Sequence, residues 1–392
     1  MSSRDRILTT HTGSLPRPDD LVVLLQARHE GKKFDEKALE GRAHAAVAEC
    51  VAKQVDCGID IVSDGEMSKI SYSYYVADRL QGLESPENAA ARGEQLKRFH
   101  QLTIAYPDFP DFEADRAKKV EGPRSTMVPV CTGPLAYRDM SAIEDDIAVL
   151  KQSVAASGAK ASFMTAASPG VIAMFCPRTS YYSKEEDYVF ALAEAMKTEY
   201  ETIYKSGTVL QIDCPDLALC NRMKYQNADV DPLRIAERNI EAVNHAIANI
   251  PGDRVRLHLC WGNYAGPHTT DLEAAKLFSV LRKTKARGLS FEGSNPRHEH
   301  EWEDWTKLAK MPDDMVLIPG VIDSVSTFVE HPRLVAQRIS HFVDSVGRER
   351  VIAGTDCGFG TFATGNKPVF ETIVWAKLRA LCEGAEIASQ LG

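Results

Sequence analysis

Short apolar runs, each ending in small, polar or glycine-containing residues, recur along this 392-residue chain. The segments between them carry helical periodicity. In residues 185–205, steps of three and four connect Val189, Leu192, Ala193, Met196 and Tyr200. Residues 37–56 and 231–250 behave similarly. Alternation of strands with helices predicts parallel strands that are covered by helices on the outside.

Nine runs read as strands: 9–14, 59–66, 127–134, 162–170, 209–215, 255–262, 289–293, 315–323 and 351–358. A (β/α)8 barrel has eight places, so one run is an extra element, and the sequence leaves open which one. An open doubly wound sheet is the alternative, but the GxGxxG loop expected after its first strand is absent. We therefore predict an α/β protein with a (β/α)8 TIM barrel, in a single domain over residues 1–392, with an insertion around 84–121.

Charge and composition exclude several classes of protein. The net charge is −9, and no basic stripe of the kind that a general nucleic-acid binder needs is present. No apolar run reaches the roughly 18 residues of a membrane span, and residues 1–10 lack the apolar core of a secretory signal. The nine cysteines are scattered, which favours reduced thiols. We therefore expect a cytoplasmic protein whose partners include neither nucleic acid nor membrane.

Chemically versatile residues fall at the ends of the predicted strands. In TIM barrels the reactive groups lie where strands end at their carboxyl side, so this coincidence is the main functional signal. The residues concerned are Glu66, Asp213, His258, Cys260, Glu292, Asp323 and Cys357.

His258 and Cys260 form the most specific pair. In a strand, side chains at i and i+2 point the same way, so an imidazole and a thiolate would meet at one strand end. Cys357 and Glu292 end two other runs. One nitrogen, two sulfurs and one oxygen suit a tetrahedral zinc ion. The alternative for Cys260 is a buried packing residue, and for His258 a hydrogen-bonded core histidine.

At these positions the chain resembles the cobalamin-independent methionine synthase family, specifically its catalytic C-terminal barrel. The resemblance runs from residue 10 to about 361 and keeps the family's order. It rests on TGSLP at 12–16, DGE at 64–66, QID at 211–213, HLC at 258–260, FE at 291–292, GVID at 320–323 and DCG at 356–358.

The resemblance implies roles for these residues. The zinc ligands would be His258, Cys260, Glu292 and Cys357. Substrate would bind Thr12, Gly13 and Ser14, with the carboxylate at Ser14 and the ammonium at Glu66 and Asp213; the catalytic candidates would be Glu66, Asp213 and Asp323. Zinc would hold the substrate sulfur as a thiolate that attacks a methyl carbon. The implied enzyme is a zinc-dependent thiol S-methyltransferase of methionine biosynthesis, acting on homocysteine or a similar thiol.

Several family features are missing, and they concern the methyl donor. Val325 stands where the family has a relay histidine two residues after Asp323. The basic pair for folate survives only as Arg124, with Met127 near the lysine position, and Phe175 lies near the family's tryptophan. These changes argue against a polyglutamylated methyltetrahydrofolate. A methyl-corrinoid, as a corrinoid protein or free methylcobalamin, and methyltetrahydrofolate remain possible donors.

Three other hypotheses stay open. The first is a relative that joins coenzyme M to an epoxide with the same zinc, although the acids Glu66 and Asp213 disfavour a sulfonate. The second is a non-catalytic protein that holds zinc or accompanies a corrinoid. The third is a zinc-free decarboxylase of the uroporphyrinogen type, which shares the barrel. Separately, RHEHEWEDW at 297–305 could bind a metal but is more typical of an exposed polar loop.

Overall fold

Parallel, buried strands form the centre of the molecule. The computed structural model describes residues 3–84, 129–220, 231–307, 309–363 and 369–391. Six of its strands form one sheet in the order β2-β5-β6-β7-β8-β9. Their bounds are β2 Ile61–Val62, β5 Ala161–Ala167, β6 Val209–Asp213, β7 Val255–Leu259, β8 Gly288–Phe291 and β9 Val316–Pro319.

Two further strands close the sheet into a barrel. β1 (Leu8–Thr9) pairs in parallel with β10 (Ile352–Ala353), and single parallel bridges join β10 to β9. Between β1 and β2, the Thr10 hydroxyl donates to the Ile61 carbonyl (3.1 Å), and the Thr9 amide donates to Asp60 Oδ2 (3.0 Å). Side-chain hydrogen bonds therefore join β1 to β2, where the short strands themselves do not pair, and the predicted TIM barrel is confirmed.

The extra element is the run predicted at 127–134, of which the structure describes residues 129–134. β3 (Leu80–Glu84) and β4 (Val130–Tyr137) form a separate antiparallel hairpin. Most of β4 alternates between exposed and half-buried residues, whereas β5 to β8 are almost entirely buried. Alternation of this kind is typical of an antiparallel ribbon with one wet face. Of the predicted insertion at 84–121, all but Glu84 lies outside the described residues.

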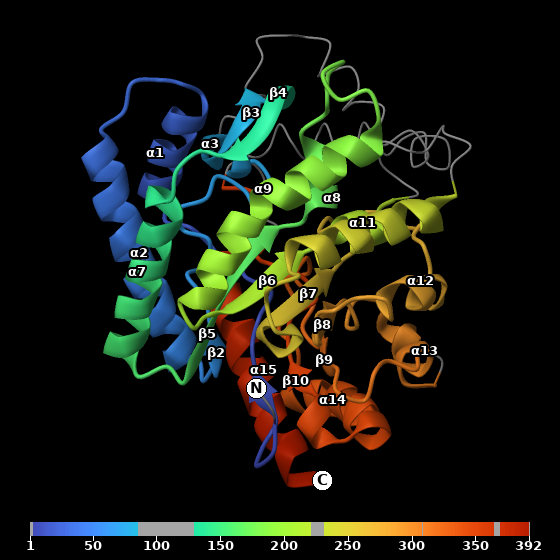
Figure 1. The fold of residues 1–392 in the computed structure, drawn as a ribbon. Coiled ribbons are helices and arrows are strands. Elements are labelled where there is room, and N and C mark those ends of the chain that lie inside the picture. Colours follow the sequence, from blue (N-terminus) through green and yellow to red (C-terminus); the bar gives the residue numbers. More distant parts are fainter. Residues whose placement is uncertain (1–2, 85–128, 221–230, 308, 364–368, 392) are drawn as a thin grey trace.

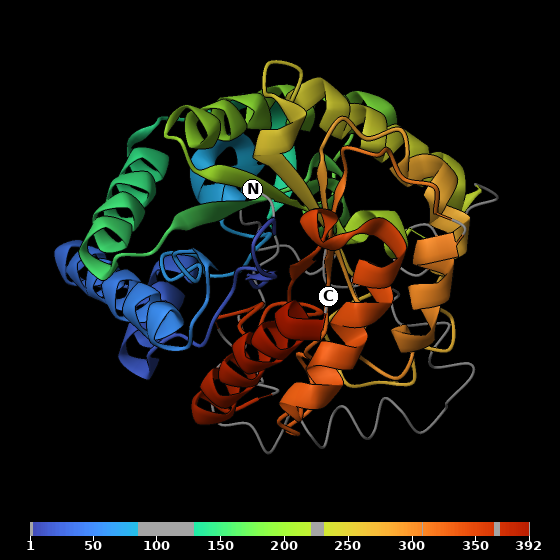
Figure 2. The same cartoon turned by 90° about the horizontal axis from the view of Figure 1, so that it is seen from below.

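Eight of the described helices surround the barrel in a ring (Figure 2). Each packs against the next in chain order, and α15 contacts α2 to complete the ring. They are α2 Glu36–Asp56, α7 Ser141–Ser157, α9 Glu185–Lys205, α11 Pro232–Ala246, α12 Ala274–Leu281, α13 Trp302–Lys307, α14 Pro332–Val346 and α15 Glu371–Leu391. The helices predicted at 37–56, 185–205 and 231–250 are confirmed, and all five stripe residues of α9 are buried.

Four further helices of the described residues lie outside this ring, and three of them, α1, α3 and α8, are labelled in Figure 1. They are α1 Asp19–His29, α3 Val76–Arg79, α8 Pro169–Phe175 and α10 Pro215–Ala218, with 3-10 turns at Gly252–Arg254, Glu299–Glu301 and Arg348–Arg350. None of the described helices combines the length and the apolar character that crossing a bilayer requires. The single-domain organisation stays a prediction.

A buried arginine fills the barrel interior. Arg256 on β7 donates to Gln211 Oε1 (2.8 Å) and to the His11 carbonyl (2.9 Å). Its guanidinium lies 3.6 Å from the centre of the Phe163 ring. Burial lowers the pKa of Arg256 to about 9. This contact set ties β7 to β6 and to the segment after β1, and so fixes the strands whose ends carry the candidate site.

Candidate metal and substrate site

His258, Cys260 and Cys357 meet at the carboxyl ends of β7 and β10. Their ligand atoms all lie within 4.8 Å of one another, and all three side chains are buried. The parallel register of β7 and the closure of β10 onto β1 and β9 bring together residues that are 97 positions apart in the sequence. The structure thus unites three of the four predicted zinc ligands.

The thiols of Cys260 and Cys357 interact with each other, and each shifts the pKa of the other. The Cys357 thiol beside Cys260 lowers the pKa of Cys260 well below its usual value. The same contact, together with burial, raises the pKa of Cys357. A cation placed between them would favour both thiolates, since metal ligation requires the deprotonated sulfur.

The His258 ring supports the metal interpretation. Neither Nδ1 nor Nε2 has a hydrogen-bond partner among the described residues, although the ring is buried. Buried polar atoms are rarely left without a partner, so the core-histidine alternative, which needs a satisfied ring, is disfavoured. An imidazole and two thiols within reach of one point form a soft donor set that fits zinc.

Glu292, the fourth predicted ligand, is held by protein donors. Its Oε1 accepts from the Trp261 amide (2.7 Å), and its Oε2 accepts from Asn295 Nδ2 (2.7 Å) and an Arg297 guanidinium nitrogen (3.1 Å). Burial and the nearby Cys260 raise the pKa of Glu292 well above its usual value. Glu292 therefore lies next to the three-residue group, and its role as a ligand stays a prediction.

Glu66 follows β2 in a strained turn. Its φ is +59°, in the left-handed region that costs non-glycine residues energy. The turn is fixed by Asp64 Oδ1, which accepts from the Glu66 amide (3.0 Å), and by Arg17 Nε, which donates to the Glu66 carbonyl (2.9 Å). Glu66 Oε1 accepts from the Thr165 hydroxyl (3.0 Å). The carboxylate is thus held buried at the rim of the barrel.

Asp213, at the end of β6, forms the second acid of the pair. Its Oδ1 accepts from Gln211 Nε2 (2.7 Å). Burial raises the pKa of Asp213 to about 7, and the neighbouring Glu66 charge adds to the rise. Burial likewise raises the pKa of Glu66. Because burial destabilises their negative charge, these two acids are a suitable place for an ammonium group.

Thr12, Gly13 and Ser14 form the loop after β1. The Thr12 hydroxyl donates to the Thr355 carbonyl (3.0 Å), and Ser14 Oγ accepts from the Gly360 amide (3.3 Å). Gly13 has a φ of +139°, and a Cβ there would lie 2.5 Å from Thr165 Cγ2. Only glycine therefore allows this loop to approach β5, and the loop lies against the segment that follows Cys357.

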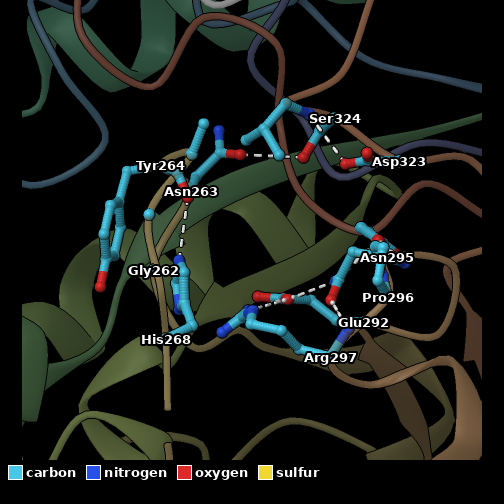
Figure 3. Close-up of a pocket in the computed structure, with 14 residues that line it drawn as sticks. Gly262, Asn263, Tyr264, His268, Glu292, Asn295, Pro296, Arg297, Asp323 and Ser324 are labelled. Carbon is cyan, nitrogen blue, oxygen red and sulfur yellow. Dashed lines mark hydrogen bonds and ion pairs between the residues drawn. The ribbon is translucent and has the colours of Figure 1, made fainter. Parts of the chain in front are cut away.

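Asp323 lines a cavity of about 200 Å³ beside Glu292. Its Oδ1 accepts from the Val325 amide (2.9 Å). Figure 3 shows Glu292 and Arg297 in contact on one side, and Asn263 bonded to Ser324 on the other. Asp323 therefore shares this cavity with Glu292.

The polar loop predicted at 297–305 is partly buried. His298 Nδ1 and Glu301 Oε2 lie 2.6 Å apart, and the His298 ring stacks on Trp261 with centroids 4.1 Å apart. The prediction of an exposed loop is wrong for these two side chains, because they support the segment that directly follows Cys260. No metal-type cluster involving them is found within the described ranges.

Tyr72 also lies near the site, although no sequence motif singles it out. The pKa of Tyr72 is raised well above its usual value, first by burial and then by the charges of Cys260, Cys357 and Asp213. Phe175 packs edge-on against Tyr72, with centroids 5.9 Å apart. Arg124 and Met127 lie outside the described residues.

Three polar residues around Glu66 were not among the site residues predicted from the sequence. They are Arg17, Lys69 and Thr165, all buried. Thr165 could have been found, because it is a polar residue within an otherwise apolar buried run. Arg17 lies three positions after Ser14, and nothing in its spacing indicated that it would fold back onto Glu66.

The catalytic-domain family described as "Cobalamin-independent synthase, Catalytic domain" matches residues 7–174 and 124–367. The uncharacterized protein YxjH of Bacillus subtilis (strain 168) is 24% identical, over 94% of this chain and 91% of that protein. The methionine synthase of Saccharolobus solfataricus is 23% identical, over 100% of this chain and 97% of its own.

Among solved structures, the B12-independent methionine synthase from Shewanella sp. W3-18-1, in complex with selenomethionine, superposes with a TM-score of 0.69. It is 18% identical, and the match covers 98% of each chain. At that identity the likeness shows the barrel fold. Because the family match spans most of the sequence, the chain belongs to the cobalamin-independent synthase family, in its catalytic domain, which confirms the predicted family and enzyme class.

Proposed function

We propose that this protein transfers a methyl group to the sulfur of homocysteine or a closely similar amino-acid thiol, at a zinc site. The observation that carries the proposal is the group of His258, Cys260 and Cys357, whose ligand atoms lie within 4.8 Å of one another. In the paired strands β6 and β7, Asp213 lies opposite His258. His258, Cys260 and Cys357 would hold the zinc, with Glu292 as the fourth ligand. Zinc, when bound, lowers the pKa of a coordinated thiol and so supplies the nucleophile at neutral pH.

The chain's own residues would position the amino acid. Glu66 and Asp213 would bind the ammonium group, which adds positive charge beside two acids whose pKa values are raised by burial. The Ser14 hydroxyl would donate to the carboxylate. Anchoring both groups fixes the side chain of the substrate, so that its sulfur is directed toward the metal residues and away from water.

The methyl donor would approach from the opposite side. The family is cobalamin-independent, which does not support the predicted corrinoid protein or methylcobalamin. We therefore favour a methylated folate. Asp323 lines the cavity beside Glu292, and we keep it as the polar group on the donor side.

Metal analysis and a donor panel test the proposal together. The purified protein should hold about one zinc per chain and should methylate homocysteine with 5-methyltetrahydrofolate, which is tested both as its monoglutamate and as its triglutamate. Removal of the metal with a chelator should abolish turnover, and added zinc should restore it. Protein with no zinc affinity, or zinc-loaded protein that is inert with both folates, would overturn the proposal.

A further inference from the structure

Arg17 is buried where three segments of the site meet. Its Nε donates to the Glu66 carbonyl (2.9 Å), and its first terminal nitrogen donates to the Gly360 carbonyl (2.5 Å). The Gly360 amide in turn donates to Ser14 Oγ. The guanidinium and the Ser14 hydroxyl therefore flank the same residue, so Arg17 lies beside the proposed carboxylate position.

The second terminal nitrogen of Arg17 has no hydrogen-bond partner in the part of the chain that the structure describes. It forms an ion pair at 3.6 Å with Glu66 Oε2, which likewise accepts no hydrogen bond from the described residues. Both side chains are only 2% exposed. Leaving a buried donor and a buried acceptor unsatisfied is costly, and two such atoms side by side point toward a polar group that contacts both.

An α-amino acid has the complementary arrangement. Its ammonium and carboxylate are attached to one carbon, so the ammonium can donate to Glu66 Oε2 while the carboxylate accepts from Arg17. Guanidinium–carboxylate contacts are among the stronger hydrogen bonds in proteins. The chemistry matches a zwitterion better than an amine or an acid alone.

We propose that Arg17 is a further substrate-binding residue, which contacts the α-carboxylate and makes the site selective for thiols that are α-amino acids. The inference rests on the proposed function and deepens it, because it specifies the class of acceptor. It assigns the carboxylate to Arg17 together with Ser14, and it leaves the ammonium to Glu66 and Asp213.

The test compares equilibrium binding of three thiols to the zinc-loaded protein by calorimetry. L-Homocysteine has both charged groups, 3-aminopropanethiol lacks the carboxylate, and 4-mercaptobutanoate lacks the ammonium. Arg17→Met should weaken homocysteine and 4-mercaptobutanoate by roughly 10- to 100-fold and change 3-aminopropanethiol by less than about threefold. Glu66→Gln should have the opposite effect on the two truncated ligands: it should weaken the binding of 3-aminopropanethiol more than that of 4-mercaptobutanoate.

Zinc content and thermal unfolding serve as controls for folding, and Arg287→Met, at a half-buried arginine that pairs with the exposed Asp314, is the matched arginine variant. If Arg17→Met does not fold, Arg17→Lys should still bind homocysteine and 4-mercaptobutanoate more weakly, and its affinity for 3-aminopropanethiol should not change. Equal losses for all three thiols, or no loss, would overturn the assignment while the proposed function stands. If the wild-type protein binds none of them, both proposals fail.

Discussion

The Thr165 hydroxyl on β5 donates a hydrogen bond to Glu66 Oε1 across the barrel rim, at 3.0 Å. Lys69 Nζ lies 3.2 Å from the same hydroxyl oxygen and can only donate to it. The hydroxyl proton is therefore directed to Glu66. This relay fixes one carboxylate oxygen and leaves Oε2 for the substrate.

Thr165→Val should raise the KM for homocysteine about tenfold, because a hydrogen bond to a charged group is lost while the shape is kept. Zinc content should not change, since Thr165 contacts none of the proposed ligands. Steady-state kinetics with metal analysis would check this. Thr202→Val, at an exposed position on α9, is the matched control, and an equal effect in both variants would contradict the relay.

Cys357→Ala should reduce the zinc bound per chain from about one to a small fraction, because one of two thiolate ligands is removed. Cys382→Ala, which lies near Thr9 and away from the site, should keep its zinc. Metal content after dialysis against a weak chelator measures the difference. Equal zinc in the two variants would show that Cys357 is not a ligand.

His11 should make the fold sensitive to acid. Burial lowers its pKa to about 4 from the ordinary 6.5. The unfolded chain takes up the proton more readily, so the stabilisation present above pH 6.5 is lost as the pH falls toward 4, by up to about 3 kcal/mol. His11→Asn, which keeps an acceptor near the Gly13 amide, should flatten the pH dependence in urea unfolding. If the free energy of unfolding declined equally with falling pH in the wild-type protein and in His11→Asn, His11 would not be the source of the acid sensitivity.

Glu199→Gln should destabilise the fold by about 3 kcal/mol, because it removes a buried charge with three donors. Glu199 accepts from the Tyr75 and Tyr137 hydroxyls (2.6 and 2.5 Å) and from Arg79 (3.1 Å). Urea unfolding would measure the loss. Glu201→Gln, on the exposed side of the same helix, should change stability by less than about 0.5 kcal/mol, and comparable losses in both would contradict the argument.

The sequence alone predicted the barrel, the main helices and the chemistry at strand ends. Periodicity located α9 because burial of one helical face imposes steps of three and four, and HLC at 258–260 predicted a shared direction because strand side chains repeat every two residues. The family motifs then assigned roles. All of these signals are local, so one sequence contains them.

Contacts between distant segments needed the tertiary structure. That β4 pairs with β3 outside the barrel, that Cys357 reaches His258, and that Arg17 folds onto Glu66 all depend on how the strands close. Glu292 ended its strand as predicted, yet the Trp261 amide, Asn295 and Arg297 decide where its carboxylate lies. Residue types fix which groups can react, but only the closed barrel determines which of them meet.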